Sequence, residues 1–141
     1  MNRVSKILRS EAGFTVTFFA LMMPVFLAIL GLCADGSFII YNKIALDKAS
    51  DAAGLATIDS YDRESWLLEG KTVLREDKAW EYATMILQSN MSNARLIHLE
   101  IPEDRKNECR IETEAEVPTF FLKIFLIHSY KIRAYSVSYG N

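Results

Sequence analysis

The side chains that most often perform chemistry in proteins are few in this sequence and lie far apart. The two histidines, His98 and His128, are separated by 30 positions, and neither has a second ligand type at metal-binding spacing. Glu112, Glu114 and Glu116 alternate with apolar or small residues, so they share one face of a predicted strand and lie beside no histidine. We therefore predict no catalytic residue, no bound metal and no cofactor, and a protein that is not an enzyme.

Two cysteines, Cys33 and Cys109, leave three arrangements open. A disulfide between them would persist in an oxidising compartment. Two separate thiols packed as small apolar groups, or a bridge between two chains, are the alternatives. Two cysteines are too few for a four-cysteine zinc site or for a small fold held together by several disulfides.

Composition limits the size and class of the protein. The chain has 141 residues, a formal net charge of −2, 50% hydrophobic residues and 24% charged residues. This length allows one small domain beside one apolar segment, and it excludes a large multidomain enzyme and a polytopic transporter. Because basic residues cluster only at the N-terminus, we do not expect nucleic acid to be a partner.

Residues 14–34 form an uninterrupted stretch of 21 residues without a charge. A helix needs about 20 apolar residues to cross the hydrocarbon core of a bilayer. Arg3, Lys6 and Arg9 precede the stretch and Asp35 follows it. The excess of positive charge before the stretch predicts a cytoplasmic N-terminus and places the rest of the chain on the other side of the membrane.

A cleaved signal peptide and a buried core helix are the alternatives to a membrane anchor. The apolar stretch is longer than the core of about 7–15 residues found in signal peptides. A signal-peptidase cut after Ala34 would also require a small residue where Leu32 stands. These two features favour a retained anchor.

The helix is predicted to continue past the membrane as a stalk over residues 35–60, which contain no proline. Alanines recur along the stalk at spacings of three and four, which place them on one side of a helix. Such a stripe of small residues lets another backbone approach closely. Either the chain's own sheet or second helix, or a helix of a partner chain, is expected to cover it. The predicted packing residues are Ala45, Ala49, Ala52, Ala53 and Ala56.

The remaining residues, 61–141, predict a small folded head beyond the stalk. Apolar residues at helical spacing indicate a second helix over 64–88, with Trp66 and Trp80 in its core and Gly70 as a point where it is interrupted. Period-two alternation indicates strands over 96–101, 109–117 and 130–139.

Two features of the head leave alternatives open. The glutamate row of strand 109–117 either faces Lys131 and Arg133 on a neighbouring strand or is simply solvated. Residues 120–127 are strongly apolar apart from Lys123, which is consistent with a short buried helix or with a membrane-facing loop.

These elements predict an α+β fold in which a long N-terminal membrane-spanning helix continues as a stalk. The head is expected to contain one or two helices on a three-stranded antiparallel sheet. The predicted organisation is a basic cytoplasmic leader (1–13), a transmembrane helix (14–34), a helical stalk (35–60) and an α+β head (61–141).

The N-terminus resembles the leader junction of type IV prepilins. In that family a short basic leader ends in glycine, and a prepilin peptidase cuts before a phenylalanine, here Gly13 and Phe14. Phe18 stands where most prepilins have a glutamate five positions into the mature chain. The resemblance implies a processing site between Gly13 and Phe14.

A longer stretch is similar to the TadE/TadG-like proteins of Tad (Flp) pilus systems. It includes Phe-Phe-Ala-Leu-Met-Met-Pro-Val-Phe-Leu at 18–27 and Gly-Leu-Cys-Ala-Asp-Gly at 31–36. It continues with Leu-Asp-Lys-Ala-Ser-Asp-Ala-Ala-Gly-Leu-Ala at 46–56, and Glu-Val-Pro-Thr-Phe-Phe at 116–121 resembles a later segment of the same proteins.

The resemblance implies a Tad/Flp-type pilus assembly protein or minor pilin that acts by helix packing and protein–protein contacts. Its expected partners are the membrane and other pilin or pilus-assembly subunits, in a homo- or hetero-oligomer. The resemblance also implies a place in a bacterial inner membrane with the α+β head in the periplasm, or alternatively in an extracellular filament. The alternatives are a pseudopilin of a type II secretion or competence system and a single-span structural subunit of another envelope complex.

Overall fold

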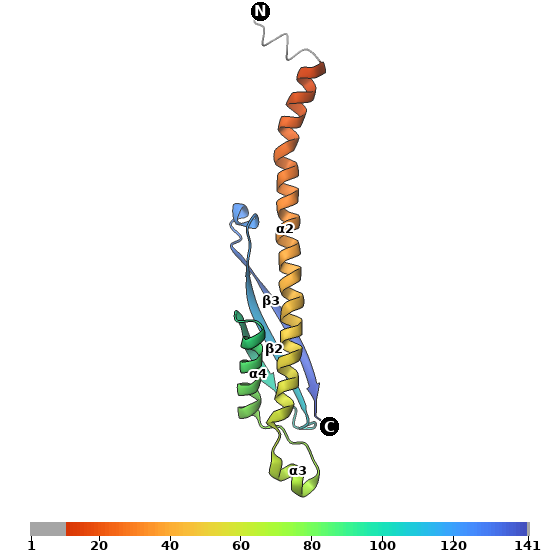
Figure 1. The fold of residues 1–141 in the computed structure, drawn as a ribbon, viewed down its shortest axis with the longest axis vertical. Coiled ribbons are helices and arrows are strands. Elements are labelled where there is room, and N and C mark those ends of the chain that lie inside the picture. The colour runs from red at the N-terminus through yellow and green to blue at the C-terminus, as the bar shows by residue number, and fades with distance from the viewer. Residues whose placement is uncertain (1–10, 141) are drawn as a thin grey trace, which may run out of the picture. The chain divides into compact units, whose positions relative to one another are not determined.

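The computed structural model describes residues 11–140 and confirms the predicted α+β class (Figure 1). It contains one long helix, two short helices, two 3-10 turns and three strands. In chain order these are α2 (Glu11–Thr57), η1 (Ile58–Ser60), α3 (Arg63–Glu69), α4 (Glu76–Asn90), β1 (Ala94–Glu100), β2 (Glu108–Pro118), η2 (Leu122–Phe125) and β3 (Ser129–Tyr139).

The described residues form two compact units, and helix α2 contributes to both. The first unit contains the helix up to Ser37 together with Thr119–His128. The second contains Phe38–Pro118 and the chain from Ser129 onward. Residues 38–57, which lie in the predicted stalk, pack in the same unit as the sheet.

One helical stretch in the described part of the chain, Gly13–Ser60, is long and apolar enough to cross a membrane. Only 6% of the most apolar 18-residue stretch of this helix is buried by the rest of the chain, whereas the core helix of a soluble domain is mostly buried. The helix continues through Pro24 without interruption. Residues 14–34 are thus a candidate membrane span.

The sheet is antiparallel with strand order β1-β2-β3. Strands β2 and β3 pair along their whole length, from Glu108 with Tyr139 to Pro118 with Ser129. Alternate residues of both strands are buried, which gives the sheet one apolar face and one polar face. This confirms the strands predicted from period-two alternation.

Helix α4 and the C-terminal part of α2 supply the helical side of the core, beside the sheet (Figure 1). The inward face of α4 consists of Ala79, Ala83 and Leu87, at a spacing of four residues. Leu46 on α2 is fully buried in the same cluster. Small residues on the helices let them lie close to the strands.

Polar side chains also join α2 to the sheet. The hydroxyl groups of Ser50 and Thr113 lie 2.5 Å apart in the buried interior. A Cβ added at Gly54 would lie 2.7 Å from the Ser138 hydroxyl, so a side chain at this position would force the helix and β3 apart. Ser136 donates a hydrogen bond of 2.9 Å to the Asp51 carboxylate.

Strand β1 departs from the alternation that the sequence predicts for residues 96–101. Its register with β2 shifts between Leu96 and His98. The resulting bulge exposes Ile97 and turns Leu96 and Leu99 toward the core. A bulge adds one residue to one strand of the pair, so the alternation is offset by one position beyond it.

The predicted helix over 64–88 is two helices, and the prediction of core tryptophans was wrong. Gly70 adopts φ 64° after α3 and ends that helix, as its position suggested. Trp66 and Trp80 are 50% and 43% exposed. None of the residues of α3 is buried, and Trp80 lies next to Ala79, just off the inward stripe of α4.

Candidate functional site

In the first unit, three hydrogen bonds join helix α2 to a loop that lies far from it in the sequence. We call this site the Asp35 junction, and it consists of Asp35 and the loop 119–128. Asp35 is 1% exposed, although it is the first charged residue after the apolar segment. One of its carboxylate oxygens accepts the N–H of Phe120 at 3.0 Å, and the other accepts the N–H of Phe121 at 2.9 Å and of Leu122 at 2.7 Å.

The loop needs this acceptor for a reason intrinsic to helical turns. The first N–H groups of a helix have no carbonyl partner in the preceding turn. Phe121, which precedes η2, has no side-chain group that caps the turn. Asp35 fills that role from another segment, and a carboxylate is the favoured group at the positive end of such a turn. A buried carboxylate is in turn stabilised by several donors.

The loop is closed by its own hydrogen bonds as well. At its base the Thr119 N–H donates to the carbonyl of His128 at 3.1 Å, and the Thr119 hydroxyl donates to the carbonyl of Ile127 at 2.5 Å. Its turn ends at Leu126, which adopts φ 65°. Residues 122–125 do form a short 3-10 helix, but none of its residues is buried, so the prediction of a buried helix was wrong in its burial.

Phe121 fixes the loop to the apolar segment itself. A Cβ added at Gly31 would lie 2.3 Å from the Phe121 ring, so the ring occupies the space above the glycine. Gly31 lies one helical turn before Asp35 and inside the span predicted at 14–34. The glycine is therefore required for the close approach of the loop.

The predicted alanine face of α2 is divided between two surroundings. Ala49 and Ala53 are 3% and 0% exposed and belong to the core that the chain's own sheet completes. Ala45, Ala52 and Ala56 are half-buried. Their spacings of seven and four place them on one flank of the helix, beside the buried side. The structure thus separates two groups that the sequence presented as one stripe.

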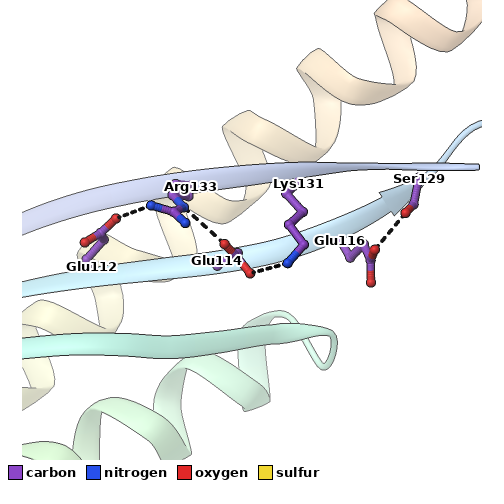
Figure 2. Close-up of polar contacts among 6 residues, drawn as sticks. All are labelled: Glu112, Glu114, Glu116, Ser129, Lys131 and Arg133. Atoms are coloured by element: carbon purple, nitrogen blue, oxygen red, sulfur yellow. Dashed lines mark hydrogen bonds and ion pairs between the residues drawn. The ribbon is translucent and has the colours of Figure 1, made fainter. Parts of the chain in front are cut away.

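The polar face of the sheet contains the predicted row of charges, and Figure 2 shows that the row is paired across strands. Glu114 accepts from Arg133 at 3.1 Å and from Lys131 at 3.5 Å. Arg133 also reaches Glu112 at 3.4 Å, and Ser129 donates to Glu116 at 2.7 Å. The alternative in which the row faces Lys131 and Arg133 is confirmed.

The Arg133 contact predicts a small pH-dependent stabilisation. The hydrogen bond from Arg133, supported by Lys131, lowers the pKa of Glu114. A lowered folded-state pKa adds stability above the unfolded value of about 4.3, and that stability is lost as pH falls through the folded-state pKa. We expect Arg133→Gln to reduce the free energy of unfolding near pH 7 and to have little effect in acid. Urea unfolding of the full chain in detergent at both pH values measures this.

Arg63→Gln supplies the control, because Arg63 is an exposed arginine on α3. Its effect should not depend on the charge of Glu114. Equal destabilisation by Arg133→Gln at neutral and acidic pH would show that packing of the arginine side chain, rather than the ion pair, accounts for its contribution.

The other predicted site residues are placed without forming a catalytic centre in the described residues. Gly13 and Phe14 lie in the first turns of α2, and residues 1–10 of the predicted leader lie outside the described residues.

Cys33 is exposed and Cys109 is buried, and both are free thiols. Burial raises the pKa of the Cys109 thiol, so it is a poor nucleophile. No group of three or more His, Cys, Asp or Glu side chains in the described range is arranged to hold a metal.

Sequence reasoning did not pair Asp35 with the loop. In the sequence, Asp35 is the charge that ends the apolar segment, and residues 120–127 are an apolar stretch after a strand. A chemical signal in the sequence could have indicated the pairing. A single acid at the end of an apolar helix calls for hydrogen-bond donors, and an apolar turn without a capping side chain calls for an acceptor. Asp35 and Phe120 are 85 positions apart in the sequence, so no local pattern showed that they complement each other.

Residues 15–54 match the family model described as TadE-like protein. The match covers the apolar segment and most of the helix that packs on the sheet. No curated protein and no solved structure matches the chain significantly. The predicted resemblance to TadE-like proteins is thus confirmed for this part of the chain.

Proposed function

We propose that this protein is a single-pass envelope protein of Tad/Flp-type pilus assembly, with the character of a minor pilin. The observation that supports the proposal most directly is the TadE-like match of residues 15–54. The same residues include an apolar helix whose side chains the chain itself leaves exposed. The proposed role is one of assembly and involves no catalytic centre.

The proposed orientation follows from charge. Residues 1–13 contain Arg3, Lys6 and Arg9 against the single acid Glu11, and this excess favours the cytoplasmic side. The sheet and helices α3 and α4 would then lie in the periplasm of a bacterial inner membrane. There they present the surface that contacts other pilin or pilus-assembly subunits.

Two helix surfaces are proposed for these contacts. Residues 14–34 pack either against lipid or, after extraction from the membrane, against other apolar helices in a filament. The flank formed by Ala45, Ala52 and Ala56 is half-buried and made of small side chains, which suits the close approach of a partner's helix. Ala49 and Ala53 serve the chain's own core instead.

A strain that lacks this protein tests the assembly role. We expect its cells to lose surface filaments, as counted by electron microscopy, and a wild-type copy to restore them. Ala52→Leu should accumulate normally and yet fail to restore filaments, because it adds bulk to the proposed flank. Leu55→Phe is the control, since Leu55 is 63% exposed and lies outside the flank. Normal filaments in the deletion strain would exclude the assembly role.

Processing at Gly13 and Phe14 is tested separately, by the intact mass and N-terminal peptide of protein purified from its native membranes. A chain that begins at Phe14 is the result expected of a minor pilin that enters a filament. A chain that retains residues 1–13 would contradict processing and leave a permanent anchor of the assembly machinery.

The second candidate is a pseudopilin of a type II secretion or competence system. The Gly13–Phe14 junction favours it, because the two systems share this signature, while Phe18 in place of glutamate weakens it. A deletion strain that keeps its filaments but loses secretion of exported proteins or DNA uptake would identify this alternative. Retention of all three activities would favour a structural subunit of another envelope complex.

A further inference from the structure

The loop 119–128 displays apolar side chains that the chain does not cover. The exposed fractions of its large apolar residues are among the highest outside the apolar helix, and Ile124 and Leu126 reach 77% and 83%. The exposed members are Phe120, Phe121, Ile124, Phe125, Leu126 and Ile127. A contiguous apolar surface of this kind normally marks contact with a membrane or a partner.

The loop is attached to helix α2 at the C-terminal end of the apolar segment. Its first residues donate three hydrogen bonds to Asp35, which directly follows the apolar segment. The Phe121 ring lies on Gly31, one turn further into that segment. Any medium that surrounds the last turn of the apolar helix therefore also meets the loop.

Most backbone N–H groups of the loop have hydrogen-bond partners within the protein, as an environment without water requires. Irregular backbone is costly in contact with lipid unless its polar groups have internal partners. At least seven of the ten N–H groups in residues 119–128 donate to Asp35 or to carbonyl groups of the same loop. These are the N–H groups of Thr119, Phe120, Phe121, Leu122, Ile124, Leu126 and Ile127.

We propose that loop 119–128 inserts its apolar side chains into the bilayer beside the end of the 14–34 helix, as a second membrane contact held in place by Asp35. The inference rests on the proposal that residues 14–34 cross the bilayer. Lys123 fits this position, because a lysine stem can lie along apolar surface while its amine reaches the lipid headgroups. Its amine lies 6.0 Å from the centre of the Phe120 ring.

Site-directed nitroxide labelling of the full chain in phosphatidylethanolamine–phosphatidylglycerol vesicles tests the insertion. Labels are attached to Ile124→Cys in a Cys33→Ser background, in which Cys109 remains buried and unreactive. Oxygen concentrates in lipid, and a nickel chelate stays in water. We expect the label at position 124 to collide several-fold more with oxygen, relative to nickel, than a label at Leu67→Cys.

Two label sites make each outcome decisive. Leu67 is 75% exposed on α3 of the other unit, which matches Ile124 in chemistry and exposure, and its label should favour nickel. A label at Leu27→Cys reports on the proposed span. If position 27 favours oxygen and position 124 favours nickel, the insertion is overturned and the span stands. If position 27 favours nickel, the span fails and the insertion with it.

A protein partner on the loop would give a third pattern. The label at position 124 would be immobilised and poorly accessible to both reagents, because protein would surround it. That pattern would overturn lipid insertion. A second label at Leu126→Cys guards against a local effect of the first, since Leu126 lies in the same loop and is also highly exposed.

Discussion

Asp35→Asn should release the loop 119–128 from helix α2. The asparagine has nearly the same shape, but it loses the charge and replaces one acceptor oxygen with an NH₂ group that faces backbone donors. Hydrogen bonds to a charged acceptor are the stronger kind, so their loss should speed amide exchange at Phe120, Phe121 and Leu122 by at least about tenfold. Hydrogen–deuterium exchange of the full chain in detergent measures the effect.

Asp47→Asn is the matched control for this experiment. Asp47 lies on the same helix and forms an ion pair with Lys43, four residues earlier, with about half of its side chain exposed. Its substitution should leave exchange at residues 120–122 unchanged. If Asp35→Asn also leaves it unchanged, the loop is held by its own hydrogen bonds and by Phe121, and the Asp35 junction has no structural role.

Leu46→Ala should destabilise the unit that contains the sheet by about 2–5 kcal/mol, the range for large-to-small changes in a core. Leu46 is fully buried on α2 and lies in one cluster with residues of α4 and of all three strands. Removing it leaves a cavity at the centre of the contact between the helix and the sheet. Urea unfolding of the full chain in detergent, followed by the fluorescence of Trp66 and Trp80, measures the loss.

Ile44→Ala tests whether burial, rather than helix content, determines this cost. Ile44 lies two residues away on the same helix and is 50% exposed, so we expect a loss below about 1 kcal/mol. Equal losses for the two variants would mean that residues 38–57 act as an independent helix. The protein would then consist of a stalk that ends at residue 60 and a separate head, as the sequence predicts, rather than of one core that includes α2.

The sequence alone was sufficient for the apolar helix, the paired strands β2 and β3 and the break at Gly70, because each of these depends on a local pattern. A run of 21 uncharged residues predicts a helix of membrane-spanning length wherever it lies in the chain. The alternation from Cys109 to Val117 predicts a strand with one polar face, because successive side chains of a strand point to opposite sides. Gly70 predicted the interruption between α3 and α4, since glycine adopts the left-handed conformation that ends a helix.

Only the tertiary structure decided which segments complete one another. Asp35 finds its donors 85 or more residues away, and no local pattern encodes that distance. The same holds for Ala49 and Ala53, which meet the sheet while the neighbouring alanines stay half-exposed, and for Trp66 and Trp80, which helical spacing placed in a core. Periodicity shows that a residue has an apolar side to cover, and the packing of distant segments determines which residues are covered and by what.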